Sequence, residues 1–266
     1  MKYLYIFILK LIIENERLIT KELNNKRLDK TSVNFRYMLF DMFKNYPKDS
    51  ILNVRKVPER FLCKTDLEFW VLNSYMNVSV KTGFGPAVHQ EEFESFMSFL
   101  ETLKISLKTL RFIRFYHYAD ETYDGSGIKT LRLSEFWEKY KVQIREASKE
   151  LSQPFIVRAI VQRCVIKGKR ETLQPINYLY YGDEKHGVFV HRNDIWKYVC
   201  DLEERDAPYL HFGPFKYVQK IHKSQIVDGK YRQHSQICWP FIKEDILTIF
   251  KKTFVYTSGR VPLPSF

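Results

Sequence analysis

Two residues in the third quarter of the chain have side chains and spacing suited to acid–base chemistry. His191 and Asp194 lie three residues apart, where a short apolar run gives way to a helical pattern. A histidine near a carboxylate can act as a general base or bind a metal ion. His117 and Asp120 have the same spacing, however, and Asp194 is equally explained as a helix cap. The catalytic residues are therefore unknown from the sequence, with His191 and Asp194 as the candidates.

A second chemistry, hydrolysis of nucleic acid with Mg²⁺, needs two or three carboxylates near a lysine. The segments Asp183–Lys185 and Asp228–Lys230 both have an acid two residues before a lysine. This spacing resembles that of restriction-type nucleases, which carry the pattern on a strand, whereas both segments here lie in predicted turns. Asp201 and Glu203 lie on a predicted helix, where residues two apart point to different faces. A DNA-cleaving nuclease of a restriction or defence system, using Mg²⁺, is one alternative function, and otherwise we expect no cofactor and no metal site.

The charge of the chain favours a nucleic acid partner. Its 266 residues include 43 Lys and Arg against 31 Asp and Glu, which gives a formal net charge of +12. An excess of this size attracts phosphate backbones. With 45% hydrophobic and 16% aromatic residues, the chain is also globular and not a disordered basic tail. We therefore expect a double-stranded DNA-binding protein of the regulator, replication-initiator or mobile-element type, with an RNA-binding protein as a further alternative.

The N-terminal part has the order of a known DNA-binding module. Thr20 is expected to cap a short helix that includes Glu22 and Leu23, and Thr31 and Ser32 open a longer helix. A basic extended segment, residues 51–61, follows. This order resembles a winged-helix or helix-turn-helix module over residues 3–63. An ordinary helical subdomain is the alternative.

The resemblance implies roles for particular residues. Five would lie at the start of the recognition helix, where such modules contact base edges: Lys30, Thr31, Ser32, Asn34 and Arg36. Arg55 and Lys56 would lie on the wing and contact phosphates. On the longer helix, predicted over Val33–Tyr46, an apolar stripe of four residues is expected to face the core: Val33, Tyr37, Phe40 and Phe43.

The centre of the chain predicts an antiparallel β-meander. Three runs rich in β-branched or aromatic residues cover Phe155–Lys167, Thr172–Tyr181 and Val188–Arg192. The first turn of this meander carries three basic residues for phosphate contact: Lys167, Lys169 and Arg170. After the third strand, Asn193 or Asp194 is expected to cap a helix. A further strand is predicted over Leu110–Tyr118.

A hairpin is predicted near the C-terminus. Its strands cover Lys216–Ile226 and Lys230–Trp239, joined by Asp228-Gly229, a dipeptide typical of tight hairpin turns. Four of its basic residues are candidate phosphate contacts: Lys220, Lys223, Lys230 and Arg232.

These elements indicate an α+β fold in two parts. Residues 1–82 form a helical, winged-helix-like part, and residues 83–266 form an α+β domain with an antiparallel sheet. Helices are also expected over Gln90–Lys104, Glu135–Leu151 (capped by Ser134) and Phe241–Phe254. The four cysteines are far apart in the sequence, which suits a reducing cytoplasm. The first apolar run is too short to span a bilayer, so no membrane partner is expected, and a homodimer is compatible with a module of this kind.

Overall fold

The chain folds into two compact units, and both mix helices with a β-sheet. The computed structural model describes residues 14–58, 63–83, 87–127, 130–169, 174–202, 207–220 and 234–258. Unit 1 consists of Met1–Gly85, Ile166–Tyr198 and Ile242–Phe266, and unit 2 consists of Pro86–Val165 and Val199–Phe241. The predicted α+β class is confirmed.

Unit 1 is built on a six-stranded sheet in the order β1-β2-β3-β4-β6-β7. Its strands are β1 (Lys26–Arg27), β2 (Ile51–Lys56), β3 (Leu67–Val71), β4 (Ser74–Lys81), β6 (Tyr178–Gly182) and β7 (Gly187–His191). Neighbouring strands are antiparallel except β4 and β6, which are parallel. A parallel pair requires a crossover, and here the connection from β4 to β6 runs through the first segment of unit 2.

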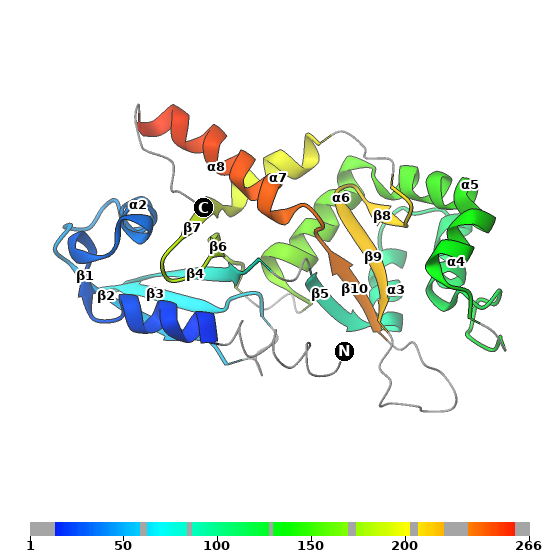
Figure 1. Cartoon of the computed structure of the whole chain (residues 1–266), viewed down its shortest axis with the longest axis horizontal. Helices are drawn as coiled ribbons and strands as arrows, with labels where there is room; N and C mark the ends of the chain where they lie inside the picture. Colours follow the sequence, from blue (N-terminus) through cyan, green and yellow to red (C-terminus); the bar gives the residue numbers. More distant parts are fainter. Residues whose placement is uncertain are drawn as a thin grey trace. The chain divides into compact units, whose positions relative to one another are not determined.

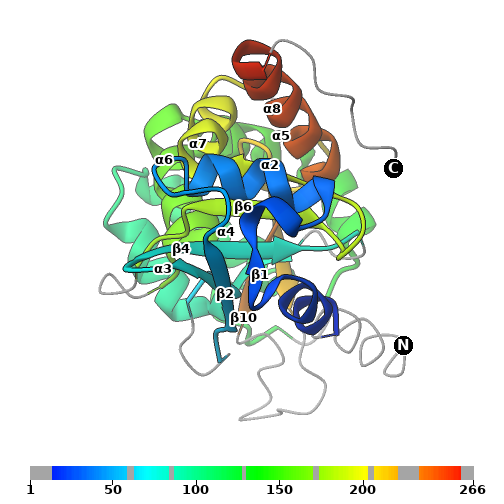
Figure 2. The same cartoon turned by 90° about the vertical axis from the view of Figure 1, so that its left-hand side faces the viewer.

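Helices cover this sheet on both sides. They are a helix over residues 14–23, the short 3-10 helix η1 (Leu28–Lys30), α2 (Val33–Met42), α7 (Arg192–Cys200) and α8 (Ile242–Ser258). Figures 1 and 2 show α2 on one side of the strands and the helix over residues 14–23 on the other. Phe35 of α2 stacks on Tyr180 of β6 with ring centroids 5.1 Å apart. On β7, Phe189 meets Phe250 of α8 at 5.8 Å.

Two predictions for the N-terminal helices are wrong. Thr20 lies inside the helix over residues 14–23, and its hydroxyl donates to the Glu16 carbonyl, so it is not a cap. The buried face of α2 consists of Phe35, Met38, Leu39 and Met42. The predicted stripe is wrong at Val33, which is 59% exposed, and at Tyr37, which is 40% exposed, whereas its last residue, Phe43, is buried. In a helix rich in apolar residues, more than one face contains apolar side chains three and four residues apart. Only packing in the folded chain decides which of these faces is buried.

Unit 2 is built on a four-stranded sheet in the order β5-β10-β9-β8. Its strands are β5 (Ala87–Glu92), β8 (His211–Phe212), β9 (Phe215–Lys220) and β10 (His234–Cys238). The helices of the unit are α3 (Phe93–Glu101), α4 (Leu107–Tyr118), α5 (Leu133–Leu151) and α6 (Pro154–Val161), followed by the π-helix η3 (Gln162–Lys167). Antiparallel pairing of β9 with β10 confirms the predicted C-terminal hairpin. Its predicted turn, Asp228-Gly229, lies outside the described residues.

Two predicted strands of unit 2 are helices. Residues 155–167 form α6 and η3, so only the second and third predicted strands of the meander exist, as β6 and β7. Pro154 occupies the first turn of α6, where its missing N–H costs nothing. Residues 110–118 belong to α4. Ser106 is the N-cap residue of this helix, and its hydroxyl accepts from the Thr109 N–H. Short apolar runs fit a strand or a buried helix equally well.

Other boundaries shift by a few residues. The helix predicted over Gln90–Lys104 begins as strand β5 and becomes helical only at Phe93. Arg132, and not Ser134, is the N-cap residue of α5. The first helical residue of α7 is Arg192, so Asn193 and Asp194 lie within its first turn and do not cap it.

Candidate functional site

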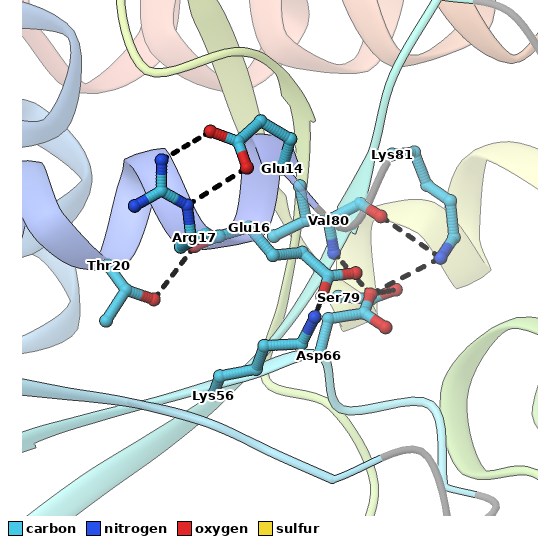
Figure 3. A network of polar contacts seen from close by, with 9 residues as sticks. All are labelled: Glu14, Glu16, Arg17, Thr20, Lys56, Asp66, Ser79, Val80 and Lys81. Atoms are coloured by element: carbon cyan, nitrogen blue, oxygen red, sulfur yellow. Dashed lines mark hydrogen bonds and ion pairs between the residues drawn. The ribbon is translucent and has the colours of Figure 1, made fainter. Parts of the chain in front are cut away.

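A cluster of charged side chains lies where β4 of unit 1 ends. Asp66, just before β3, accepts three hydrogen bonds at Oδ2: from the Ser79 hydroxyl at 2.9 Å, the Val80 N–H at 2.6 Å and the Lys81 ammonium at 3.4 Å (Figure 3). The Asp66 N–H in turn donates to the Val78 carbonyl at 2.9 Å. Because residues two apart on a strand face the same side, Ser79 and Lys81 reach Asp66 together.

A second carboxylate reaches the same place from the helix over residues 14–23. Glu16 is only 8% exposed, and Figure 3 shows its side chain beside Asp66. Burial and the negative charge of Asp66 raise the pKa of Glu16 above its usual value, although the hydrogen bond from Lys56 opposes them. The Lys56 Nζ lies 2.7 Å from Glu16 Oε2. Two carboxylates and two lysines, from four different segments, therefore meet in one cluster.

The cluster has the oxygen atoms that a small divalent cation needs. Hard cations such as Mg²⁺ prefer carboxylate and carbonyl oxygens. Among the described residues, the hydrogen bonds to Asp66 all end on Oδ2, which leaves Oδ1 for another ligand. The Val80 carbonyl already interacts with a cation, because it accepts from the Lys81 ammonium at 3.2 Å. In the part of the chain that the structure describes, no three His, Cys, Asp or Glu gather at one point, so the cluster offers two carboxylates and no more.

Sequence reasoning missed this cluster for a clear reason. The segment Ser79-Val80-Lys81 lies on a strand, as the restriction-type pattern requires, but a serine stands where that pattern has an acid. A search for acid-x-lysine therefore passes over it. Lys56 pairs with Glu16, and its predicted contact with phosphate on a wing stays a prediction.

The acid-x-lysine segments found in the sequence do not form such a cluster. Asp183 lies in the turn between β6 and β7, where its Oδ1 accepts from the N–H groups of Lys185 at 2.8 Å and His186 at 2.7 Å. Its carboxylate thus closes the turn. Lys230 and Glu203, from the other two patterns, lie outside the described residues.

His191 and Asp194 lie in a separate polar region of unit 1. The His191 Nδ1 accepts from the Asn193 N–H at 3.3 Å, so the histidine ring itself caps α7. Burial lowers the pKa of His191, against the opposing charge of Asp194. The ring centroid of His191 lies 5.1 Å from that of Tyr178, whose hydroxyl donates to Asp41 at 2.8 Å. The two candidates are therefore near each other, and their catalytic role stays a prediction.

The predicted base-contacting residues differ in exposure. Thr31 is buried and its hydroxyl donates to the Leu28 carbonyl at 2.8 Å, while Arg36 donates to the Thr31 carbonyl at 2.7 Å. Ser32 and Asn34 are half-buried, and Lys30 is exposed. The winged-helix resemblance stays a prediction.

The other predicted phosphate contacts lie on several elements. Arg55 is exposed and pairs with Glu68 at 2.5 Å. Lys167 is half-buried at the end of η3, and Lys169 is exposed. Lys220 ends β9. The remaining residues of this prediction lie outside the described part of the chain: Arg170, Lys223, Lys230 and Arg232.

Unit 2 contains a buried carboxylate of a different kind. Glu91 of β5 accepts from both Nε and Nη2 of Arg163, at 2.8 and 2.7 Å, and from the Ser95 hydroxyl at 3.0 Å. His89 Nε2 lies 2.9 Å from the same carboxylate. Burial alone would raise the pKa of Glu91, but the hydrogen bonds from His89 and Arg163 outweigh it and lower the pKa to about 2. Four polar contacts satisfy this carboxylate, which is typical of a structural ion pair.

Comparison of the chain with protein-family models finds no match, and no curated protein matches it. Among the described helices, none combines the length and the apolar character needed to cross a membrane. Since neither comparison finds a match, the function of the chain is inferred from the geometry of its own side chains.

Proposed function

We propose that this protein is a Mg²⁺-dependent nuclease that binds double-stranded DNA and hydrolyses its phosphodiester bonds. The observation that carries the proposal is the meeting of Asp66, Glu16 and Lys81 at the end of β4. Two carboxylates near a lysine are what such a site needs. The placement of Lys81 on a strand, two residues after a polar side chain, resembles restriction-type nucleases, with Ser79 in place of the acid.

The residues of the cluster fit a bound Mg²⁺. Asp66, Glu16 and the Val80 carbonyl would hold it. When bound, the ion lowers the pKa of a coordinated water and neutralises phosphate charge. The pKa of Glu16 is raised by burial and by the charge of Asp66, and a bound cation would offset both effects.

The side chains of the chain have distinct tasks in hydrolysis. Overall, a water oxygen bonds to phosphorus, the bond from phosphorus to one sugar oxygen breaks, and that oxygen leaves with a proton. The Lys81 ammonium is placed to donate to a phosphate oxygen and stabilise the charge that builds there. Ser79 and the Val80 N–H fix the Asp66 carboxylate in one orientation, so that it need not reorganise during the reaction.

The net charge of the chain supports a polyanionic substrate. At +12, the protein attracts phosphate backbones without regard to sequence. Basic residues such as Lys30 and Lys169 are exposed and available for this contact. We propose that they hold the duplex.

Incubation of supercoiled plasmid DNA with the full chain tests the proposal. We expect nicked or linear DNA with Mg²⁺ and none with EDTA. Asp66→Asn should reduce cleavage by roughly a hundredfold or more while gel retardation in EDTA persists. Asp183→Asn is the matched control, because its carboxylate also accepts hydrogen bonds in unit 1 but only closes a turn, and it should cleave like the unchanged protein.

Other outcomes identify the alternatives. Retardation of DNA without cleavage, in Mg²⁺ and in Mn²⁺, would overturn the nuclease and favour a DNA-binding regulator. Tighter binding to RNA than to duplex DNA would favour the RNA-binding alternative. Equal cleavage by Asp66→Asn and the unchanged protein would show that the reaction occurs elsewhere.

A further inference from the structure

Unit 2 contains a pocket lined by aromatic rings. It has a volume of about 550 Å³ and lies between α4, α5 and the loop over residues 119–127. Four aromatic side chains line it: Phe112, Phe115, Tyr123 and Tyr140. Phe115 meets Tyr140 edge-on at 5.0 Å and Tyr123 at 5.5 Å. The volume falls in the range of small-molecule sites.

The loop that carries Tyr123 is held in place by its own hydrogen bonds. Asp120 accepts at Oδ1 from the Thr122 N–H at 3.0 Å and the Thr122 hydroxyl at 2.7 Å, and at Oδ2 from the Gly127 N–H at 3.2 Å. Gly125 has φ +80°, and a Cβ there would lie 2.6 Å from the Tyr118 ring. Only glycine therefore allows this path of the loop.

The opposite wall is fixed in the same way. The Tyr140 hydroxyl donates to Glu121 of the loop at 3.0 Å. At Tyr140 the backbone of α5 leaves helical geometry, with φ −125° and ψ 22°, so the helix kinks at the pocket. Rings positioned before a ligand arrives lower the entropic cost of binding.

The charges around the pocket are balanced. Lys108 pairs with Glu146 at 2.8 Å. The Glu150 carboxylate accepts from the Ser106 N–H at 2.6 Å and from the Thr109 hydroxyl at 2.5 Å. Arg111 and Gln143 complete the polar lining. Such a lining suits a flat, neutral ring with a polar edge better than a strongly charged or a purely apolar group.

We propose that this pocket binds an unstacked nucleobase. Bases stack on aromatic side chains in sites that take single-stranded or extruded nucleotides, and the Gln143 amide can both donate to and accept from a base edge. The inference rests on the proposed function, because a bound strand of nucleic acid would supply the base. The pocket itself can also be tested with free nucleosides.

The test uses the full chain carrying Asp66→Asn, in EDTA, so that no strand is cleaved. Binding of adenosine, guanosine, cytidine and thymidine is followed by saturation-transfer NMR, and binding of a short labelled single strand of mixed sequence by fluorescence anisotropy. Tyr123, 57% exposed, can be changed without opening the core. Tyr123→Ala should weaken strand binding roughly 5- to 150-fold and remove the nucleoside signal, whereas Tyr123→Phe, which keeps the ring, should restore both.

Phe155→Ala provides the matched control, because Phe155 is 45% exposed in the same unit and lies outside the pocket lining. It should bind strand and nucleosides like the parent. If Tyr123→Ala binds both as the parent does, or if no nucleoside and no strand binds the parent, the pocket proposal is wrong. The protein could bind nucleosides in a Tyr123-dependent way and yet neither retard nor cleave DNA. That result would support the pocket proposal and overturn the nuclease proposal, so failure of one is distinguishable from failure of the other.

Discussion

Two buried carboxylate sites show how the surroundings of a side chain separate a structural role from a chemical one. Glu91 is satisfied by Arg163, His89 and Ser95, and these contacts lower its pKa to about 2. Burial, together with the negative charge of Asp66, raises the pKa of Glu16 despite the hydrogen bond from Lys56. A raised carboxyl pKa means that the surroundings disfavour the charged carboxylate. Such a place would stabilise a bound cation. The cluster at the end of β4 is therefore the better candidate for chemistry.

The Glu91 ion pair leads to a stability prediction. Its lowered pKa means that the folded state holds the charged form more strongly than the unfolded chain does, so the stabilisation is present above pH 4.5 and is lost as the pH falls towards about 2. Glu91→Gln should lower the free energy of unfolding at pH 7 by about 3 kcal/mol, because Arg163, whose side chain is only 15% exposed, loses its charged partner. Urea unfolding at pH 7, repeated at lower pH, would show the loss and a flatter pH dependence.

Glu94→Gln is the control for this change. Glu94 is 65% exposed at its side chain and pairs with Arg114 on the surface, so its loss should cost less than about 1 kcal/mol. Equal effects of the two variants would contradict the structural role assigned to Glu91.

At the scale of elements, local patterns predicted some helices and turns correctly and failed where packing decides. The pairs β6–β7 and β9–β10 follow from apolar runs separated by turn residues, and α5 and α8 from their periodicity. Segment 155–161 is rich in Ile and Val, which favour strands, yet Ile156, Val157, Ile160 and Val161 are buried on one side of a helix. The parallel pairing of β4 with β6 joins segments that no local pattern connects. For the same reason the proximity of Glu16 to the charges of Asp66 and Lys81 could not be predicted.

The β6–β7 hairpin depends on Gly187. A Cβ at this position would lie 2.2 Å from the Tyr180 hydroxyl and 2.3 Å from its ring. Tyr180 cannot move away easily, because it is 1% exposed, stacks on Phe35 and donates to the Asp183 carbonyl at 2.6 Å. Gly187→Ala should therefore lower the free energy of unfolding by about 1–3 kcal/mol in urea denaturation.

Gly83→Ala serves as the comparison in the same unit. The nearest atom to its added Cβ would be the Tyr181 hydroxyl at 3.7 Å, an ordinary contact. A Gly187→Ala protein as stable as Gly83→Ala would show that the hairpin adapts to the extra methyl group.

At the scale of the whole molecule, the chain builds unit 1 from three segments. The predicted N-terminal part, residues 1–82, contains β1 to β4, whereas β6 and β7 come from residues 178–191. The cluster of Asp66, Glu16, Lys56 and Lys81 lies at the end of β4, the strand next to β6. The sheet that carries the cluster is therefore complete only after the chain has passed through the first segment of unit 2.

The net charge of +12 leads to a prediction about salt. Binding that releases counterions from phosphates gives a linear fall of log affinity with log salt, with a slope of roughly 0.9 per phosphate contacted. Duplex affinity of the Asp66→Asn protein in EDTA, measured by fluorescence anisotropy over a range of salt, should fall steeply in this way. A flat response would remove the polyanion partner and with it the proposed substrate.

Two triple variants separate specific phosphate contacts from overall charge. The first changes the C-terminal hairpin residues Lys220, Lys223 and Lys230 to Gln. The second changes three exposed lysines of unit 2 outside the hairpin, Lys104, Lys141 and Lys149, to Gln. Both remove three positive charges, so long-range attraction falls equally. If the hairpin contacts phosphates, only the first variant should lower the salt slope, by up to about 2.7, and it should weaken binding to all duplex sequences alike. Equal effects of the two variants would mean that the hairpin lysines contribute only to the general field of the protein and do not contact the duplex.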